Sequence, residues 1–244
     1  RTYYQPFSVL NFLAAHTTRV RLGMSVLILP MRNPIEVSAQ VAEMDQLSLG
    51  RVNFGVGVGW YREEFEALGY NFTERGRRTN DGLAIIKSLW AQQKTTIDGP
   101  YYSFVNAQTG PKPLQSSGPP IYIGGNTPAA LSRLAKFGDV WHPYKVSPDA
   151  LRDSIPVLQA ALEKNGRSAS NFPIAVKVPL TFQDGPPGKG QCVSEGRPQD
   201  IIHGLKRYIE NGATEFCFDI MNETRSNALD TMSRFTQEVR PHLQ

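Results

Sequence analysis

The sequence has few of the residues that build disulfide scaffolds, metal centres or membrane spans. It contains 2 cysteines in 244 residues, too few to staple a chain of this size. Its 4 histidines never fall at metal-ligand spacing, so we expect no metal site. No stretch approaches the roughly 20 apolar residues of a membrane-spanning helix, so we expect no membrane insertion. The low cysteine content favours a cytoplasmic protein.

The charge balance does not favour a nucleic-acid partner. The chain has 26 basic and 22 acidic residues, and the excess of +4 is spread along it. The densest basic cluster, Arg75, Arg77 and Arg78, lacks the interleaved aromatic residues of a nucleic-acid groove. We interpret this cluster as the solvated start of a helix, with an anion contact as the alternative.

Motifs of nucleophilic and metal-dependent hydrolases are also missing. The sequence contains no Gly-x-Ser-x-Gly, no His-Glu-x-x-His and no Cys-x-x-Cys pair. Glu63, Glu64 and Glu66 could hold a general base, but a solvated helix start is the favoured interpretation, because carboxylates stabilise a helix N-terminus. Cys217 lies in an apolar run and is expected in the core.

Strand-like and helix-like segments alternate along the chain. Near-continuous apolar strands separated by helices predict a parallel sheet, either open or closed into a barrel. Turn residues indicate an excursion at about 92–119 and a Gly/Pro loop at about 184–197, within a single domain covering residues 1–244. The predicted strands are 19–30, 51–58, 121–125, 139–144, 174–182 and 215–221, and the predicted helices are 7–16, 35–47, 62–68, 79–91, 128–137, 147–165, 200–211 and 224–239.

Glycine is concentrated where one of these strands ends. The run Gly55–Gly59 places glycines at alternate positions after a strand. A dinucleotide-binding fingerprint would need glycine at the sixth position, where this chain has Trp60. Two interpretations stay open: a flat ligand approaches the strand end, or the backbone packs tightly against its neighbours.

A second turn has the features of an anion site. Gly124, Gly125, Asn126 and Thr127 end a strand, and Pro128 opens a helix. Thr127 is suited to cap this helix, with proline at its first position. The N–H groups and the helix dipole then favour a phosphate, although a well-capped turn without a ligand has the same sequence.

Taken in order, these segments resemble the bacterial luciferase-like superfamily of flavin and deazaflavin oxidoreductases, and most closely its coenzyme F420-dependent branch. The order is specific, whereas each piece alone is not. The likeness covers nearly the whole chain and is weak between 147 and 191. The segments that carry it are Leu13–Gly23, Ser25-Val26, Pro30, Arg32–Pro34, Ala42, Met44–Ser48, Gly50-Arg51, Phe54–Trp60, Glu63–Phe65, Leu68-Gly69, Glu74-Arg75, Arg77-Arg78, Leu89-Trp90, Pro120–Gly125, Gly138-Asp139 and Trp141.

The resemblance implies a (β/α)8 TIM barrel in which strand 19–30 is the third and 215–221 the eighth. The first two βα units would then be missing from this sequence. We hypothesise about fifty to sixty further residues before Arg1, two units of usual size. An intact mass of 27.1 kDa for the natively produced protein would contradict this. The resemblance places acid/base groups in those units, so no catalytic group is named here.

The resemblance also assigns cofactor positions. In the family a bulge in the third strand, often with a non-prolyl cis peptide, supports the ring, and this position matches Ser25-Val26, with Ile28 two residues on. Val58 and Gly59 match ring or side-chain contacts, although a polar residue often replaces Val58. The deazaflavin-dependent sugar-phosphate dehydrogenases have an acidic residue where this chain has Trp60. The absence of that acidic residue here disfavours sugar-phosphate dehydrogenase activity. The phosphate turn matches Gly124, Gly125, Asn126 and Thr127, and Arg75, Arg77 and Arg78 are weaker candidates for a phosphate or acidic tail.

The resulting expectation is an F420-dependent oxidoreductase that transfers a hydride between the deazaflavin and a small organic substrate. Candidates for the substrate wall are Trp60, Trp141, His142 and Tyr144. His142 could also be an acid/base group, but a hydrogen-bonded structural histidine is the favoured interpretation. The runner-up is a monooxygenase that uses reduced FMN and O2. A non-catalytic flavin- or deazaflavin-binding protein is the third possibility. Family members are commonly dimers, so we expect a homodimer.

Overall fold

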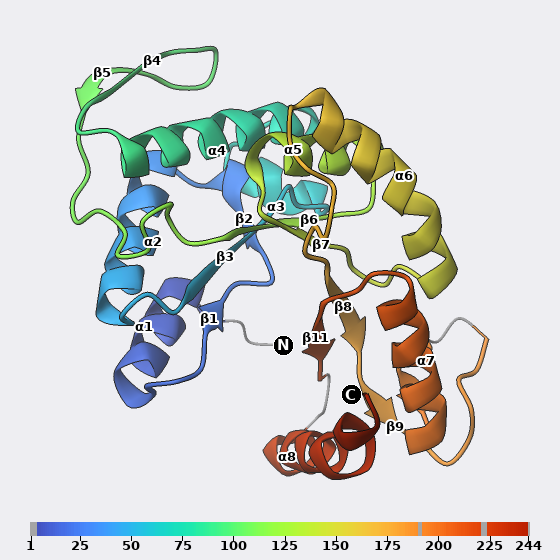
Figure 1. Ribbon diagram of the computed structural model, residues 1–244. Helices are drawn as coiled ribbons and strands as arrows, with labels where there is room; N and C mark the ends of the chain where they lie inside the picture. Colours follow the sequence, from blue (N-terminus) through green and yellow to red (C-terminus); the bar gives the residue numbers. More distant parts are fainter. Residues whose placement is uncertain (1–3, 190–191, 221–223, 244) are drawn as a thin grey trace. The chain divides into compact units, whose positions relative to one another are not determined.

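The computed structural model describes residues 4–189, 192–220 and 224–243 (Figure 1). The backbone divides into two compact units, each described here by itself. Unit 1 comprises Arg1–Gly124 and Lys136–Asp139, and unit 2 comprises Gly125–Ala135 and Val140–Gln244. The single domain stays a prediction. Within the described residues, no helix combines the length and the apolar character needed to cross a membrane.

Unit 1 is built around one central strand, β3 (Val52–Gly57). Val52, Phe54 and Val56 on one face are at most 1% exposed, and Gly55 and Gly57 on the other face are buried as well, as expected for a strand covered on both faces. On one edge it pairs with β1 (Leu22–Gly23) and β2 (Leu27–Ile28), and on the other with β6 (Ile121–Gly124), always in parallel (Figure 1). The carboxyl ends of β2, β3 and β6 therefore meet at the same end of the sheet.

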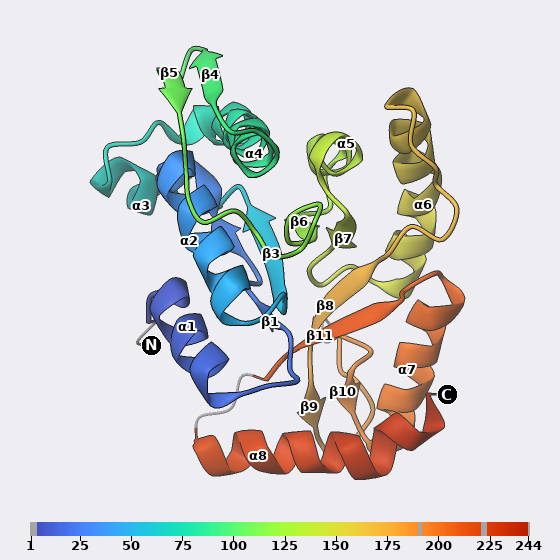
Figure 2. The same cartoon turned by 60° about the vertical axis from the view of Figure 1, so that its left-hand side comes forward.

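Helices cover this sheet as the sequence predicts, with one boundary shifted. Asn33 caps α2 through the Ile35 N–H at 2.9 Å, with Pro34 at its first position. The predicted start of the helix at 79 is wrong, because α4 already begins at Arg75. Figure 2 shows α2 and α4 side by side. The helices of unit 1 are α1 (Pro6–His16), α2 (Pro34–Leu47), α3 (Arg62–Ala67) and α4 (Arg75–Ala91), with the 3-10 turns η1 (Leu29–Met31) and η2 (Phe72–Glu74).

The continuous strand predicted for 19–30 is also wrong. The chain forms β1, leaves the ladder at Met24–Val26, and rejoins it as β2. It can bulge because Gly55 on the neighbouring strand has no side chain: a Cβ there would lie 1.7 Å from the Met24 carbonyl oxygen. The predicted excursion is present and holds an antiparallel hairpin, β4 (Thr95–Asp98) and β5 (Ser103–Ala107).

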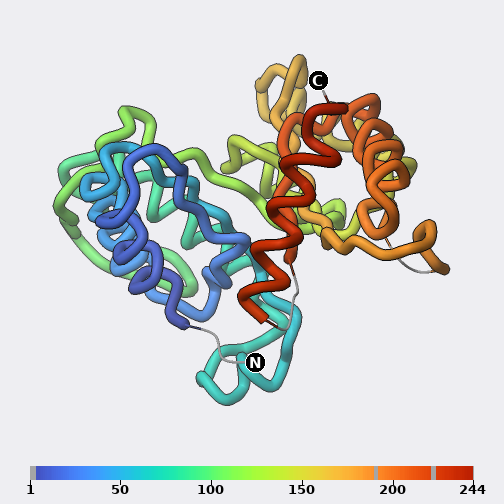
Figure 3. The backbone as a smooth tube through the Cα atoms, turned by 90° about the horizontal axis from the view of Figure 1, so that it is seen from below, coloured from blue at the N-terminus to red at the C-terminus, as the bar shows by residue number. Residues whose placement is uncertain are grey.

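Unit 2 continues the alternation of strands and helices. Strand β11 (Glu215–Asp219) pairs in parallel with β8 (Ala175–Pro179), and β10 (Glu195–Gly196) pairs in parallel with β9 (Thr181–Phe182). The π-helical turn η3 (Phe235–Val239) packs on α7. Figure 3 shows the path of the backbone through this carboxyl-terminal part, in red. The other elements are α5 (Pro128–Phe137), whose last two residues belong to unit 1, β7 (Val140–His142), α6 (Pro148–Lys164), α7 (Pro198–Glu210), α8 (Arg225–Arg234) and η4 (Arg240–His242).

The two faces of β11 differ in character. Phe216 contacts the ring of Tyr208 on α7, and Phe218 contacts Phe235. Because side chains alternate along a strand, Cys217 faces away from these helices. Its expected place in the core is wrong, since it is half-buried. Met221, the predicted end of this strand, lies outside the described residues.

The predicted loop at 184–197 is partly ordered by β10. Ser194 is fully buried, and its hydroxyl donates to the Pro179 carbonyl at 2.6 Å. Gly204 of α7 lies against this segment: a Cβ there would be 2.3 Å from the Val193 carbonyl oxygen. The carboxyl-terminal end of this loop therefore packs against the rest of unit 2. Residues 190–191 of the loop lie outside the described residues.

Candidate functional site

At the carboxyl ends of the unit 1 strands, one valine lies over three glycines. A Cβ at Gly57 would lie 2.4 Å from Cγ2 of Val26, and one at Gly124 would lie 3.3 Å from its Cγ1. A Cβ at Gly55 would be 3.4 Å from the same Cγ1. The glycines therefore make room for the Val26 side chain, which supports tight packing as their role. Val26 itself is only half-buried and presents an aliphatic surface at this end of the sheet.

The neighbouring positions complete this part of the site. The Ser25–Val26 peptide bond is cis, where the resemblance places such a bond, and Ser25 is exposed. Ile28 is the register partner of Gly57. Gly59 has φ of +79°, and a Cβ there would lie 2.8 Å from Cγ2 of Ile28, so both conformation and space require glycine. Val58 is half-buried and brings no polar group.

Directly after Gly59, two large aromatic side chains face solvent. Trp60 is 84% exposed and Tyr61 is 51% exposed, with ring centroids 5.5 Å apart. Such exposed aromatic surface at the end of a barrel strand is available to a substrate. The following carboxylates Glu63 and Glu64 are exposed on α3, as expected for a solvated helix start.

The arginine cluster at the start of α4 differs from its prediction. Arg75 stacks on the Phe72 ring at 3.8 Å and donates to the Phe72 carbonyl. The Arg78 guanidinium lies 4.9–5.3 Å from three tyrosine rings, those of Tyr70, Tyr101 and Tyr102. Of the three, Arg77 is exposed and Arg75 and Arg78 are half-buried. Aromatic residues do surround this cluster, so its expected lack of aromatic neighbours is wrong. Tyr70 and Phe72 directly precede it in the sequence, and Tyr101 and Tyr102 come from the excursion.

In unit 2, the predicted phosphate turn leads into α5. Thr127 accepts a hydrogen bond from the Ala130 N–H through its side chain at 3.3 Å and through its carbonyl at 2.9 Å, which confirms it as a cap. Gly125 has φ of +112°, a conformation that favours glycine. Asn126 and Thr127 are exposed. The start of a ten-residue helix therefore faces solvent at the carboxyl end of β6, where an anion is favoured.

Two side chains fix the conformation of this turn. The Trp141 indole, which is 0% exposed, donates to the Gly125 carbonyl at 2.9 Å. The Asn126 side-chain amide donates to the Tyr144 carbonyl at 2.9 Å. Trp141 thus supports the turn from within the core, and its place in a substrate wall stays a prediction. Sequence reasoning missed this role because it depends on a contact across the turn.

His142 is also buried, with 5% of its surface exposed. Its Nδ1 lies 2.6 Å from the Ala175 carbonyl oxygen, so Nδ1 carries the proton that this contact requires. Burial lowers the pKa of His142, and the nearby Lys177 ammonium acts in the same direction. The imidazole is therefore neutral at physiological pH, with a structural hydrogen bond.

Two lysines lie beside the exposed ring of Tyr144. Nζ of Lys145 is 5.5 Å and Nζ of Lys177 is 5.4 Å from the ring centroid. Tyr144 is 45% exposed. These cations bring positive charge near the Asn126–Tyr144 contact. Lys145 is the next residue in the sequence, whereas Lys177 belongs to β8 and could not be placed here from local sequence.

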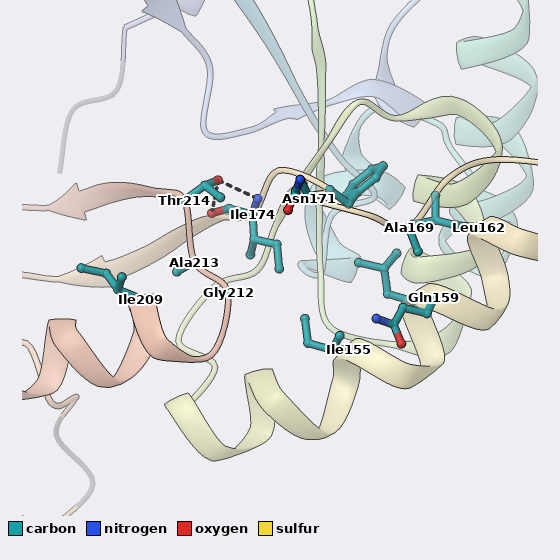
Figure 4. A pocket seen from close by; sticks show the side chains of 12 residues that line it. Ile155, Gln159, Leu162, Ala169, Asn171, Ile174, Ile209, Gly212, Ala213 and Thr214 are labelled. Atoms are coloured by element: carbon teal, nitrogen blue, oxygen red, sulfur yellow. Dashed lines mark hydrogen bonds between the residues drawn. The ribbon is translucent and has the colours of Figure 1, made fainter.

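A pocket elsewhere in unit 2 holds none of the predicted site residues (Figure 4). It has a volume of about 340 Å³ and lies between α6, the end of α7 and the segments before β8 and β11. Thr214 and Ile174, which line it, are hydrogen-bonded to each other just before these strands begin. Barrel enzymes keep their active sites at the opposite, carboxyl ends of the strands, so this pocket is not the candidate active site.

The chain belongs to the luciferase-like monooxygenase family, whose model matches residues 1–186. An uncharacterised protein of Mycobacterium tuberculosis is 31% identical over 69% of this chain and 58% of its own length. The F420-dependent glucose-6-phosphate dehydrogenase of Kineococcus radiotolerans is 30% identical over 72% of this chain and 53% of its own. The FMNH2-dependent dimethylsulfone monooxygenase of Pseudomonas putida is 27% identical over 68% of this chain and 46% of its own. The alignments thus span about half the length of these relatives.

Solved structures establish the fold. An F420-dependent secondary alcohol dehydrogenase gives a TM-score of 0.85 with 18% identity, over 100% of this chain and 85% of that chain. A monooxygenase from Streptomyces bottropensis gives 0.84 with 18% identity, over 100% and 87%. The fold is that of the luciferase-like (β/α) barrel enzymes, which confirms the predicted class. Both F420-dependent and FMN-dependent enzymes occur among the relatives.

Proposed function

We propose that this chain belongs to an F420-dependent oxidoreductase that transfers a hydride between the deazaflavin and a small organic substrate. The observation that carries the choice of cofactor is the aliphatic character of three ring-support positions, Val26, Ile28 and Val58. The N5 atom of a flavin accepts hydrogen bonds, whereas the C5 carbon of a deazaflavin does not. Side chains that offer no donor at these positions therefore suit the deazaflavin better.

Each unit, taken by itself, has residues that fit a part of such a cofactor. In unit 1 the methyl groups of Val26 cover the backbone of Gly55, Gly57 and Gly124 and form a smooth apolar face at the strand ends. In unit 2 the exposed residues Asn126 and Thr127 stand at a helix start, where the helix dipole suits a phosphate. These two features match the two parts, a flat ring and a phosphate, that F420 and FMN share.

When bound, the deazaflavin supplies a two-electron hydride donor or acceptor. The protein binds the cofactor, orients the substrate over the ring and excludes water. Val26 and Ile28 would support the ring, and the turn capped by Thr127 would hold the phosphate. Trp60 and Tyr61, exposed after Gly59, would contact the substrate. His142 is neutral and bonded to the backbone, so we assign it a structural role and no proton transfer.

The second candidate is an FMN-dependent monooxygenase. The relative from Pseudomonas putida, named as an FMNH2-dependent enzyme, favours it. The turn at Thr127 would serve either cofactor equally, because both carry a phosphate. The reactions differ in their need for oxygen, since reduced flavin reacts with O2 and a reduced deazaflavin does so poorly.

The test is a parallel titration of the purified protein with oxidised F420 and with FMN, followed by fluorescence. We expect tighter binding of F420. Preference for FMN would move the proposal to the monooxygenase, and cofactor binding without turnover on a broad substrate panel would favour a non-catalytic binding protein. Thr127→Val serves as the internal control, because losing the cap should weaken both cofactors by the same factor if the phosphate binds at this turn. Val58→Thr adds a hydroxyl, and we expect it to improve binding of FMN only.

A further inference from the structure

A second pocket, in unit 1, adjoins the end of β6 opposite to the residues assigned to the cofactor. Its volume is about 240 Å³. One wall is the last turn of α4, with Lys87, Trp90 and Ala91, and the other is the segment 112–118 that leads into β6. It therefore adjoins the amino-terminal side of β6, whereas Gly124 stands at the carboxyl end.

The segment 112–118 is held in place by a buried carboxylate. Asp45 of α2 is 0% exposed, and its oxygens accept hydrogen bonds from the N–H groups of Leu114 and Gln115, both at 2.9 Å. They also accept one from the Gln115 side-chain amide at 2.8 Å. Gln46 donates to the Lys112 carbonyl at 2.9 Å. This wall of the pocket is thus fixed before any ligand arrives.

The opposite wall is equally fixed. The Trp90 indole N–H donates to the Ser38 carbonyl at 3.0 Å. Its ring lies against Gly118, where a Cβ would be 2.4 Å from Cε3 and where φ is +79°. Only glycine fits there, and the segment closes directly onto the indole. Because this partly aromatic wall is already ordered, it loses little conformational entropy when a ligand binds.

Two ammonium groups line this pocket. Nζ of Lys112 donates to the carbonyls of Leu89 and Gln92, at 2.5 and 2.7 Å, at the end of α4. Nζ of Lys87 donates to the carbonyl of Phe137, the last residue of α5, at 3.3 Å. Each ammonium has three N–H donors, so three of the six hydrogens remain for a ligand. The hydroxyls of Ser116 and Ser117, both exposed, line the same space.

The charges around the pocket leave a positive balance. Two helix C-termini contribute about half a negative charge each, which offsets one of the two lysine charges. The Asp45 carboxylate and the Arg21 guanidinium both hydrogen-bond to the Gln115 side chain, and their opposite charges offset each other beside this wall. About one unit of positive charge remains. No carboxylate lines the pocket.

We propose that this pocket binds a small organic acid, with its carboxylate between Lys87 and Lys112 and its body against Trp90. The volume admits a molecule of about the size of benzoate, smaller than usual cofactors. Because the pocket adjoins the amino-terminal side of β6, bound acid would act on the stability of the barrel and would not compete for the cofactor positions.

The test is a titration with sodium benzoate, followed by proton–nitrogen NMR of the Trp90 indole, the Gly118 amide and the Gln115 side-chain amide. We expect saturable shifts at these three signals. Benzamide, which has the same body without the charge, should bind at least tenfold more weakly, as loss of a charge-assisted hydrogen bond implies. The proposal would be overturned if no saturable shift appeared at a benzoate concentration about ten times a millimolar Kd. Equal binding of benzamide would also overturn it.

Variants assign the binding to the two lysines. Lys87→Gln and Lys112→Gln keep hydrogen-bond donors for the helix-end carbonyls but remove the charge, and each should weaken benzoate about tenfold. Lys94→Gln, an exposed lysine on the same side of the excursion that does not line the pocket, should leave it unchanged. If Lys112→Gln does not fold, Lys87→Gln alone decides the question. Equal benzoate affinity in Lys87→Gln and Lys94→Gln would contradict the proposal.

Discussion

The Val26 side chain occupies the space beside Gly57: a Cβ added to Gly57 would lie 2.4 Å from Cγ2 of Val26. Gly57 ends β3 and Val26 lies in the break between β1 and β2, and the valine fills the space that the glycine leaves. The same valine reaches Gly124 on the other side of β3. One aliphatic side chain thus packs on glycines of two strands, β3 and β6, and these glycines serve packing first.

Gly57→Ala should destabilise the protein, because the added methyl group overlaps Val26. We expect a loss of about 1–3 kcal/mol in the free energy of unfolding, measured by urea denaturation. Val26→Ala in the same chain should recover part of this loss, because it removes the overlapping Cγ2. Gly185→Ala is the control, since a Cβ there meets nothing within 4 Å. Strictly additive effects of the changes at 26 and 57 would contradict the packing relationship.

Trp141→Phe should loosen the turn that precedes α5. The change keeps most of the buried ring but removes the hydrogen bond to the Gly125 carbonyl, at a cost of about 0.5–1.5 kcal/mol. We expect faster hydrogen exchange of the Ala130 and Leu131 amides, whose acceptor is Thr127. Trp90→Phe loses a similar bond in unit 1, to Ser38, and should leave these two amides unchanged. Unaltered exchange in Trp141→Phe would show that the indole does not hold the turn.

The buried imidazole of His142 should make stability fall at acidic pH. Burial lowers its pKa in the folded chain, while the unfolded chain regains the ordinary value of about 6.5. As the pH falls, the unfolded state binds the proton first, so the free energy of unfolding decreases below about pH 6.5 and levels off below the folded pKa. Urea titrations between about pH 5 and 8 measure this slope.

His142→Gln should reduce that slope, because the amide does not titrate. The control is His242→Gln, which changes an exposed histidine outside the core. If the two variants show the same pH dependence as the unchanged protein, another group is responsible for it.

Asp45→Asn should weaken the anchor of the segment 112–118. The carboxylate accepts from two backbone amides and one side-chain amide, and an asparagine would turn an N–H group toward some of these donors. A buried donor left without an acceptor costs about 1–3 kcal/mol. Urea denaturation should show this loss, together with altered amide signals at Leu114 and Gln115. Asp98→Asn, on the exposed β4 strand, should cost almost nothing; a similar loss in both variants would contradict the anchor.

Much of the local structure could be predicted from local sequence. Asn33-Pro34 and Thr127-Pro128 mark the starts of α2 and α5 because capping depends on neighbouring residues. The start of α4 at Arg75 could not be predicted from apolar periodicity. Its first turn is polar and its arginines pack on aromatic rings, including Tyr101 and Tyr102 of the excursion. The interruption between β1 and β2 was equally hidden, because its condition is the missing side chain at Gly55 on another strand.

The amino-acid sequence by itself determined the alternation of strands and helices, the capped turn before α5 and membership of the luciferase-like family. These properties depend on hydrophobic periodicity, on short-range hydrogen bonds and on ordered motifs. Only the tertiary structure decided that Val26 fills the glycine-lined space, that Trp141 supports the turn at Gly125, and that Lys145 and Lys177 meet at Tyr144. Apart from Lys145 beside Tyr144, these contacts join residues distant in the sequence, and the strand register, set by the packing of the core, determines which side chains meet.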